Sequence, residues 1–339
     1  MLMKRTRIAV DMASDGVSLS AFLSSAVEGL SRSKARLLAG QGMVLVDGVR
    51  AKKGATVRKG QVVDVLGELP IKGWRPMPDP SSKLDVVFES DRFIAVSKPA
   101  GVASVPLSPH ERGCLANAIA HRYPECVDAG RTRSDAGLLG RLDTGTSGLL
   151  LAARSKEAFE ELLKAQNRGK IVKYYLAVCL APRDQAAPPP PQFWGESGDL
   201  QGWKTMALPL ASSASDDERV ILADGRAGFR GRPVKARTDY RILKESEGLA
   251  LVLARITKGF RHQIRVHLAS AGLPLASDPL YGKPHPAVGA AFLLHAWRIE
   301  TDMEIRGLPP VLSSEPPENW LWKRTIGGWS RSRTRRRRR

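Results

Sequence analysis

The residues with the clearest chemical capacity lie in the stretch 140–151, which reads Gly-Arg-Leu-Asp-Thr-Gly-Thr-Ser-Gly-Leu-Leu-Leu. Arg141 and Asp143 stand in a polar turn, and an apolar run that we expect to be buried follows directly. Gly145 and Gly148 allow the backbone to bend sharply or to approach another group closely. A carboxylate that a rigid element holds beside an arginine can act as a nucleophile or a general base. The simpler interpretation is that Asp143 only caps the turn and pairs with Arg141.

Other polar motifs stand on both sides of this turn, most of them next to a segment that reads as a strand. They are Lys98-Pro99-Ala100-Gly101 after the run 93–96, Lys173-Tyr174-Tyr175 at the start of the run 173–178, the stretch 257–268 with Arg261-His262-Gln263 and Arg265 inside it, and Asp278-Pro279-Leu280-Tyr281-Gly282. One such motif alone would be a weak signal, whereas several in a fixed order are specific.

The turn and these motifs, taken in order, resemble the RNA pseudouridine synthases of the branch that acts on uridines in ribosomal and transfer RNA and carries Arg-Leu-Asp. The resemblance covers about residues 84–300 and is interrupted near 182–232. It implies an α+β fold built on a mixed, largely antiparallel sheet with a central cleft. It also implies an isomerase that breaks the bond between ribose and the base nitrogen and joins the ribose to carbon 5 of the same base. Such a reaction requires no cofactor, and none is expected.

The resemblance assigns catalytic roles to three residues of this sequence. It implies that Asp143 is the catalytic carboxylate and that Arg265 keeps it ionised and oriented. Tyr175 matches the aromatic residue that stacks on the target base or handles a proton. On residue type alone, a core tyrosine on a strand is the simpler interpretation of Tyr175.

The resemblance also implies contacts to RNA around this site. Arg141 matches the arginine that occupies the space left when the target base is flipped out of its stack. The other residues expected to contact RNA here are Lys173, Arg261, His262 and Gln263.

The sequence departs from the family pattern at two positions. Gly140 stands where members often have a histidine. Phe260 follows Gly259 where an arginine is common, so the arginine comes one residue later, at Arg261. The first change bears on the rigidity of the loop, and the second on a phosphate contact. Since neither removes a catalytic candidate, we expect activity, and the resemblance leaves the choice of target uridine open.

The chain is strongly basic, and its charge is concentrated at the two ends. The 339 residues carry a net charge of +19. Residues 1–75 hold 13 Lys and Arg against 6 Asp and Glu, and residues 323–339 hold 9 Lys and Arg with no acid. This asymmetry indicates a polyanionic partner, and RNA is the simplest candidate. A solubilising surface is the alternative. No amphipathic apolar stripe accompanies the tail, so no membrane partner is expected.

The N-terminal segment predicts a small α/β module of two helices and a hairpin. The second helix, over 31–38, is basic, and Leu37 and Leu38 are expected to face inward. The pair Asp47-Gly48 predicts a tight hairpin turn. This order resembles the S4-like RNA-binding module of a small-subunit ribosomal protein and of tyrosyl-tRNA synthetases. The resemblance implies RNA contacts for Arg32, Lys34 and Arg36, and a charged, solvated helix face is the alternative.

These features divide the chain into four parts. We expect an RNA-binding module at 1–68, an extended and poorly packed proline-rich linker at 69–82, a catalytic domain at 83–322 and an arginine-rich tail at 323–339. Within the catalytic domain, 155–168 predicts an amphipathic helix that Ser155 caps. The stretch 182–232 is rich in Pro, Ser, Asp and Gly and predicts an exposed insertion to which no chemistry is assigned.

Several classes of protein are not expected. No run of about 18 apolar residues predicts a membrane span, and the basic N-terminus lacks the apolar core of a signal peptide. The cysteines Cys114, Cys126 and Cys179 are widely separated, which indicates neither a disulfide framework nor a zinc site and suits a reducing cytoplasm. His262 and His267 are poorly spaced for two ligands on one helix face, so no metal is expected. We expect a monomer.

The combined expectation is an enzyme that converts specific uridines to pseudouridine in structured RNA, with large-subunit ribosomal RNA as the leading substrate. Transfer RNA is the alternative substrate. A non-catalytic RNA-binding or ribosome-assembly factor with the same fold is a different class, and the intact set of Asp143, Tyr175 and Arg265 speaks against it. A nucleosidase or glycosidase normally needs a second positioned carboxylate, for which Asp135 is the nearest candidate.

Overall fold

The computed structural model describes residues 5–27, 30, 32–52, 54–67, 74–181, 202–225, 228–318 and 320. These residues form two compact units, one made of 5–76 with 107–111 and the other of 77–106 with 112–320. The predicted arginine-rich tail, residues 69–73 of the predicted linker, and residues 182–201 and 226–227 of the predicted insertion lie outside the described residues.

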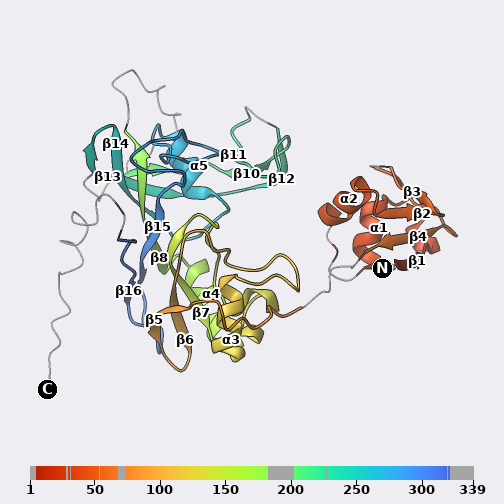
Figure 1. Ribbon diagram of the computed structural model, residues 1–339, viewed down its shortest axis with the longest axis horizontal. Coiled ribbons are helices and arrows are strands. Elements are labelled where there is room, and N and C mark those ends of the chain that lie inside the picture. The colour runs from red at the N-terminus through yellow and green to blue at the C-terminus, as the bar shows by residue number, and fades with distance from the viewer. Residues whose placement is uncertain are drawn as a thin grey trace. The chain divides into compact units, whose positions relative to one another are not determined.

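The first unit is a four-stranded antiparallel sheet with two helices (Figure 1). Its elements are β1 (Arg5–Ala9), a 3-10 helix (Met12–Ser14), α1 (Leu19–Ala26), α2 (Arg32–Gly40), β2 (Val44–Val46), β3 (Val49–Arg50) and β4 (Val62–Leu66), with the strands in the order β1-β4-β2-β3. Asp47 and Gly48 both have positive φ angles, 51° and 80°, as the predicted hairpin turn requires.

Helix α2 presents its basic residues to solvent. Arg32, Lys34 and Arg36 are exposed, while Ala35 and Ala39 are buried against α1 and the sheet. The expectation that Leu37 faces inward is wrong, because its side chain is 55% exposed. The small residues Ala35 and Ala39, four positions apart, form the buried stripe instead.

The second unit is built on a nine-stranded sheet in the order β5-β6-β7-β15-β8-β14-β13-β9, with β16 paired to β15. Every pairing is antiparallel except that of β7 with β15, which is parallel. The prediction of a mixed, largely antiparallel sheet is confirmed. The strands are β5 (Asp85–Glu89), β6 (Phe93–Lys98), β7 (Ser147–Ala153), β8 (Ile171–Leu180), β9 (Lys204–Met206), β13 (Thr238–Ser246), β14 (Leu249–Ile256), β15 (Leu294–Thr301) and β16 (Val311–Ser313).

Helices cover both faces of one half of this sheet. They are α3 (Leu115–Arg122) and α4 (Lys156–Asn167), together with the 3-10 helices Pro124–Asp128 and Arg133–Asp135 (Figure 1). Phe93 of β6 packs with Phe159 and Leu162 of α4, whereas its neighbour Ile94 packs with Ile119 of α3. Burial on both faces explains why β6 and β7 are almost continuously apolar. As predicted, the Ser155 hydroxyl caps α4 by accepting from the Ala158 N–H.

Helix α5 (Gln263–Ser270) covers one face of the other half of the sheet. On β8, Tyr175 and Ala177 pack on the same side as Leu268 of α5. The intervening Leu176 lies on the opposite side, with Trp297. This alternation places the Tyr175 side chain and the residues of α5 on one face, where the candidate site lies.

The predicted exposed insertion is wrong for the part that is described. Strand β9 extends the main sheet by pairing with β13, and β10 (Leu210–Ser213), β11 (Val220–Leu222) and β12 (Phe229–Val234) form a separate three-stranded sheet. Leu210 and Val220 are fully buried and pack with Val266 of α5. Apolar residues spaced among Pro, Ser and Asp supply this small core, which the overall composition conceals.

The end of the predicted linker is also packed, contrary to expectation. The Asp79 side chain is buried and accepts hydrogen bonds from Ser81, Ser82 and the Gly113 backbone. The Asn117 side chain donates to the Met77 carbonyl at 2.8 Å. Asp and Ser at this spacing form a local turn that ties the chain to the start of α3.

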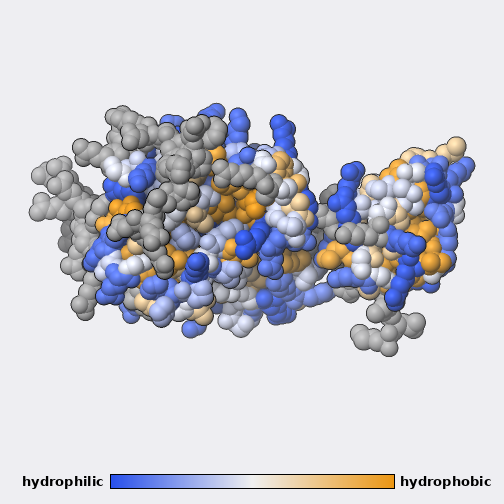
Figure 2. Space-filling view, turned by 90° about the horizontal axis from the view of Figure 1, so that it is seen from above, coloured by the Kyte–Doolittle hydropathy of each residue, from blue (hydrophilic) through white to orange (hydrophobic). Residues whose placement is uncertain are grey.

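The visible surface is mainly hydrophilic, with hydrophobic residues in small groups between hydrophilic ones (Figure 2). Cys114, Cys126 and Cys179 are free and buried. Within the described part of the chain, no helix has the length and apolar character needed to span a membrane.

Two buried histidines help to close the second unit. His267 of α5 donates from Nε2 to the Leu208 carbonyl, and its Nδ1 lies 2.8 Å from Thr238 Oγ1. His295 of β15 donates from Nε2 to the Ser314 carbonyl at 2.8 Å. Burial lowers the pKa of each histidine to about 4, so both are neutral at neutral pH.

We expect the free energy of unfolding to fall as the pH is lowered from about 6.5 to about 4. A histidine in the unfolded chain takes up a proton near pH 6.5, whereas His267 and His295 in the folded protein do so only near pH 4. Each of them therefore lowers the free energy of unfolding by about 3 kcal/mol over this range. Urea unfolding at a series of pH values measures this change in the free energy of unfolding. His267→Gln should reduce the fall by about that amount, and His121→Gln, at an exposed position on α3, should leave it unchanged. A fall of equal size in all three proteins would contradict the assignment.

Candidate active site

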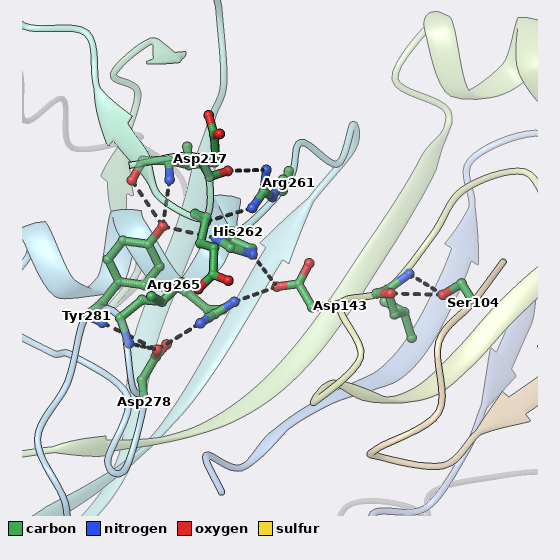
Figure 3. A network of polar contacts seen from close by, with 12 residues as sticks. Ser104, Asp143, Asp217, Arg261, His262, Arg265, Asp278 and Tyr281 are labelled. Atoms are coloured by element: carbon green, nitrogen blue, oxygen red, sulfur yellow. Dashed lines mark hydrogen bonds and ion pairs between the residues drawn. The ribbon is translucent and has the colours of Figure 1, made fainter. Parts of the chain in front are cut away.

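Asp143 is carried by a loop that is fixed immediately before it and after it. The Leu142 N–H donates to Ser104 Oγ at 3.0 Å, and the Ser104 hydroxyl donates to the Leu142 carbonyl at 2.8 Å. The Thr146 N–H donates to the Asp143 carbonyl at 3.0 Å and closes a turn. The Asp143 side chain is 23% exposed. Figure 3 shows it between Ser104 on one side and a group of charged and aromatic residues on the other.

A buried lysine, Lys98, supports the same loop through hydrogen bonds to backbone carbonyls. The Lys98 side chain is fully buried at the end of β6, and its Nζ donates to the carbonyls of Pro99, Val102 and Thr144 at 2.9, 2.6 and 3.2 Å. Burial lowers the pKa of Lys98 to about 8, against the opposing effect of Asp143. The lysine therefore remains mostly charged at neutral pH, and it links the 99–102 turn to the Asp143 loop. The sequence analysis identified the motif 98–101 but did not predict that Lys98 links the two loops.

Two glycines let the loop approach its neighbours closely. A Cβ added at Gly145 would lie 2.8 Å from the Phe292 ring. Gly148 has a φ angle of +109°, and an added Cβ would lie 2.3 Å from the Ala296 carbonyl oxygen. Gly148 therefore permits both the left-handed backbone and the contact between β7 and β15 that positions the loop.

Arg265 joins two carboxylates in the centre of the site. Its Nε and Nη2 donate to Asp278 at 2.7 and 2.8 Å in a bidentate pair, and its Nη1 donates to Asp143 at 3.1 Å. The Asp278 side chain is completely buried, whereas that of Asp143 reaches solvent. Asp278 therefore orients the guanidinium, and Asp143 is the carboxylate of the pair that can meet a substrate.

The guanidinium of Arg265 is also enclosed by aromatic rings. It lies 4.6 Å from the centre of the Phe292 ring and 5.2 Å from that of Tyr281. Burial opposes its charge, but the hydrogen bonds and charges of Asp278 and Asp143 outweigh burial and raise the pKa of Arg265. The site thus contains a permanent, immobilised cation beside Asp143.

His262 lies beside Arg265 and approaches the same oxygen of the Asp143 carboxylate (Figure 3). It precedes α5 in a left-handed conformation with a φ angle of 54°. Its Nε2 is 3.9 Å from Asp143 Oδ2, and its Nδ1 is 3.0 Å from the Tyr281 hydroxyl. Burial, together with Arg265 and Arg261, lowers the pKa of His262 to about 4 in spite of Asp143. His262 is therefore a neutral polar neighbour of Asp143 at neutral pH.

Tyr175 lies on β8, on the sheet face that α5 covers. Its side chain is only 7% exposed, and its hydroxyl has no hydrogen-bond partner among the described residues. Burial raises the pKa of Tyr175 well above the ordinary range, and the negative charge of Asp143 raises it further. The phenol therefore stays protonated at neutral pH, so it can donate a proton or stack, and it is not a ready base.

Of the three predicted catalytic residues, Asp143 and Arg265 are in direct contact, and Tyr175 packs in the same hydrophobic cluster as Leu142, close enough for the Asp143 charge to raise its pKa. Asp143 pairs with Arg265 and not with Arg141, so the simpler interpretation of the turn is wrong. Arg141 is exposed beside the site, and no described residue forms an ion pair with it. Lys173 is half-buried, and its Nζ donates to the Gln166 side chain at 2.5 Å. Burial lowers the pKa of Lys173 to about 8.

Two of the residues expected to bind RNA are engaged within the protein. Gln263 is buried, with its amide nitrogen donating to the Arg237 carbonyl and its oxygen accepting from the Phe260 N–H. The expectation of an RNA contact is wrong for Gln263, because its amide is buried and its nitrogen also donates to Thr238 Oγ1 at 3.2 Å. The Arg261 guanidinium donates to the carbonyls of Asp217 and Glu218 at 3.1 and 2.7 Å (Figure 3).

The sequence did not identify Asp278 and Tyr281 as site residues, although their motif was noticed. The Tyr281 hydroxyl contacts the backbone of Val220 at 2.8 and 3.0 Å as well as His262, so it joins the three-stranded sheet to the site. Asp135, the candidate second carboxylate of a glycosidase, instead accepts from Thr132 and caps its own 3-10 helix. Within the described ranges, no three His, Cys, Asp or Glu side chains are grouped as metal ligands would be.

Comparisons with known proteins show the family of this chain. Residues 92–270 match the RNA pseudouridylate synthase family. An uncharacterised RNA pseudouridine synthase of Chloroflexus aurantiacus is 33% identical over 81% of this chain and 79% of its own length. The ribosomal large subunit pseudouridine synthase D of Pseudomonas aeruginosa is 26% identical, and the match covers 86% of each chain.

A solved structure supports the fold. The human protein RNA pseudouridylate synthase domain containing 1 superposes with a TM-score of 0.50 and 19% sequence identity. The superposition covers 72% of this chain and 87% of that one. At this identity, the similarity concerns the fold alone.

Gly148→Ala should destabilise the protein severely, by about 4 kcal/mol or more, or prevent folding. The added methyl group would overlap the backbone of Ala296, which cannot move without breaking the pairing of β7 and β15. Gly169→Ala is the matched control, because Gly169 has a φ of +72° with nothing within 4 Å of an added Cβ. It should lose only about 1–2 kcal/mol from backbone strain. Urea unfolding compares the two, and equal losses would show that close packing at Gly148 is unimportant.

Proposed function

The chain belongs to the RNA pseudouridylate synthase family and is an RNA isomerase, and from this premise we propose that it converts specific uridines in large-subunit ribosomal RNA to pseudouridine. The observation that carries the catalytic part is the contact of Asp143 with Arg265 at 3.1 Å, with Asp278 holding the arginine. The large-subunit substrate is supported by the name of the Pseudomonas aeruginosa relative, which matches this chain over 86% of its length.

The reaction is an internal rearrangement of one nucleotide. The bond from ribose C1′ to the base nitrogen N1 breaks, and a bond from C1′ to C5 forms. The proton on C5 leaves, and N1 gains one, so neither an oxidant nor a reductant is consumed. A base inside a stem or a stacked loop must first be extruded to reach a side chain, at a cost of about a few kcal/mol.

Asp143 is the group that we propose to act on the extruded nucleotide. It can attack the ribose, deprotonate the ribose or attack the base, and each route requires an ionised carboxylate with a fixed direction. Arg265 supplies a cation that cannot lose its proton at working pH and cannot swing away, because Asp278 binds two of its nitrogens. A preformed charge of this kind stabilises a reacting anion without further reorganisation.

Tyr175 and Arg141 are proposed to handle the base and the space that it leaves. The phenol ring of Tyr175 is held by β8 on the sheet face of the site, and its protonated hydroxyl is free to donate. Arg141 is exposed two residues before Asp143, without an ion-pair partner in the described part of the chain. Its guanidinium can therefore stack in the vacated position and balance nearby phosphates.

The first unit is proposed to be an S4-like RNA-binding module. The exposed cations Arg32, Lys34 and Arg36 lie on α2, a short helix packed on an antiparallel sheet. A folded module of this kind can select the shape of an RNA, whereas the phosphate contacts themselves contribute affinity without sequence preference.

Asp143→Asn should abolish pseudouridine formation while RNA binding stays within about tenfold, or roughly 1.4 kcal/mol. The amide keeps the shape of the side chain and removes the charge that the reaction needs. Asp85→Asn, at an exposed position on β5, is the control and should retain full activity. Pseudouridines are mapped in ribosomal and transfer RNA from cells that carry the wild type, each variant or no copy of this protein. Turnover by Asp143→Asn would refute its role, and loss of a transfer RNA site alone would refute the ribosomal substrate.

Tyr175→Phe should bind target RNA as the wild type does, whereas Tyr175→Ala should lose about 1–3 kcal/mol of stacking. If the hydroxyl also donates a proton, Tyr175→Phe converts bound RNA more slowly under single-turnover conditions. Tyr174→Phe is the matched control, because the Tyr174 hydroxyl donates to Glu300 and its ring packs in a different hydrophobic cluster. Wild-type behaviour of both Tyr175 variants would make Tyr175 a core residue.

A further inference from the structure

A basic cavity lies outside the catalytic group of residues. It has a volume of about 670 Å³ and is lined by four cationic side chains, those of Arg232, Lys235, Arg237 and Lys258. Among the described residues that line it, none is acidic. The cations come from the end of β12, from the connection between β12 and β13, and from the turn between β14 and α5. The topology of the chain therefore gathers them from separate segments.

Most of this positive charge is uncompensated. Arg237 forms an ion pair with Asp239 at 2.9 Å, although its side chain is still 57% exposed. Arg232, Lys235 and Lys258 are exposed and form no ion pair with any residue that the structure describes. Like charges that share a cavity repel one another unless an anion enters, so the arrangement favours an anionic ligand.

The cavity is rigidly connected to the catalytic residues. The Arg237 carbonyl accepts a hydrogen bond from the Gln263 amide at 2.9 Å, and Gln263 is the first residue of α5. The preceding residue, His262, lies 3.9 Å from the Asp143 carboxylate. Lys258 belongs to the turn that leads into the same helix. A ligand in the cavity would thus be held in a fixed position relative to Asp143.

We propose that this cavity binds backbone phosphates of the RNA strand that carries the target uridine. This inference rests on the proposed function. Small anions are usually held by buried donors or by backbone N–H groups, whereas RNA backbones are held by exposed Lys and Arg side chains, as found here. The volume is that of a ligand pocket, and Ala207 and Pro209 give it an apolar wall against which a ribose can pack.

The test removes two of the cavity charges and leaves the fold intact. Lys235→Gln with Lys258→Gln changes two exposed side chains that have no described ion-pair partner. The matched control is Lys156→Gln with Lys244→Gln, which removes two exposed lysines at the start of α4 and on β13. Lys244 lies six residues along β13 from Thr238, about 20 Å away and beyond the screening length at ordinary salt. Equal melting temperatures establish that all three proteins are folded.

Binding of target RNA is measured over a range of salt concentrations. For the cavity variant, the slope of log K against log salt should become shallower by about 0.7 for each phosphate that the variant no longer binds, and binding at low salt should weaken. The control variant should keep the wild-type slope. The single-turnover rate with saturating RNA should stay within about twofold of wild type, because Asp143 and Arg265 are untouched.

A wild-type slope in the cavity variant overturns the proposal. Tight binding of inorganic phosphate to the wild type, absent from the variant, would overturn it in favour of a small-anion site. Weaker binding of the variant to vesicles of anionic lipid, with RNA binding unchanged, would overturn it in favour of a membrane contact. Failure of the proposed function is distinguishable, because the wild type would then form no pseudouridine in any RNA, whatever the salt dependence of the two variants.

Discussion

The structure depends on one buried cation whose charge is shared between two carboxylates. Arg265 is 4% exposed, and an isolated guanidinium at that depth would be strongly unfavourable. The bidentate pair with Asp278 compensates the charge, and the remaining Nη1 points to Asp143. Because the pair with Asp278 compensates the burial of the guanidinium, Asp143 is not needed for that purpose and its carboxylate can interact with the substrate. Removal of Asp278 would therefore leave the buried guanidinium without its main compensating charge.

The rest of the second unit brings these groups to one point and holds them there. Arg265 comes from α5, which lies on one face of the sheet, and Asp143 comes from the loop that enters β7. Leu142 packs into the hydrophobic clusters of both halves of the sheet, so the loop is held by both of them. Lys98 donates hydrogen bonds to three backbone carbonyls of the two loops, and Gly148 lets β7 approach β15. A carboxylate on such a support keeps one direction, which catalysis requires more than high exposure.

The groups around Asp143 are kept in defined protonation states by burial. His262 stays neutral because its pKa is lowered to about 4, and Tyr175 stays protonated because its pKa is raised. The permanent positive charge in contact with Asp143 is therefore that of Arg265, whose pKa is raised by its two carboxylate neighbours. The three-stranded sheet takes part in this arrangement, since its backbone binds Tyr281, and the carbonyls of its 216–218 turn bind Arg261. A segment that resembles a surface insertion in composition thus forms one wall of the site.

The sequence by itself determined the periodic features of this protein. Short apolar runs predicted the central strands, Ser155 predicted the start of α4, and Asp47-Gly48 predicted the hairpin. Each of these features depends on residues that are neighbours in the chain. The ordered motifs likewise indicated Asp143, Tyr175 and Arg265. Their resemblance also implied that Arg265 orients Asp143, but only the tertiary structure decided that Asp278 binds Arg265 in a bidentate pair and so fixes the direction of the guanidinium. It also decided that Gln263 is buried and that the 202–225 segment is packed. The physical reason is that polar side chains accept many partners, so strand register and helix placement choose among them.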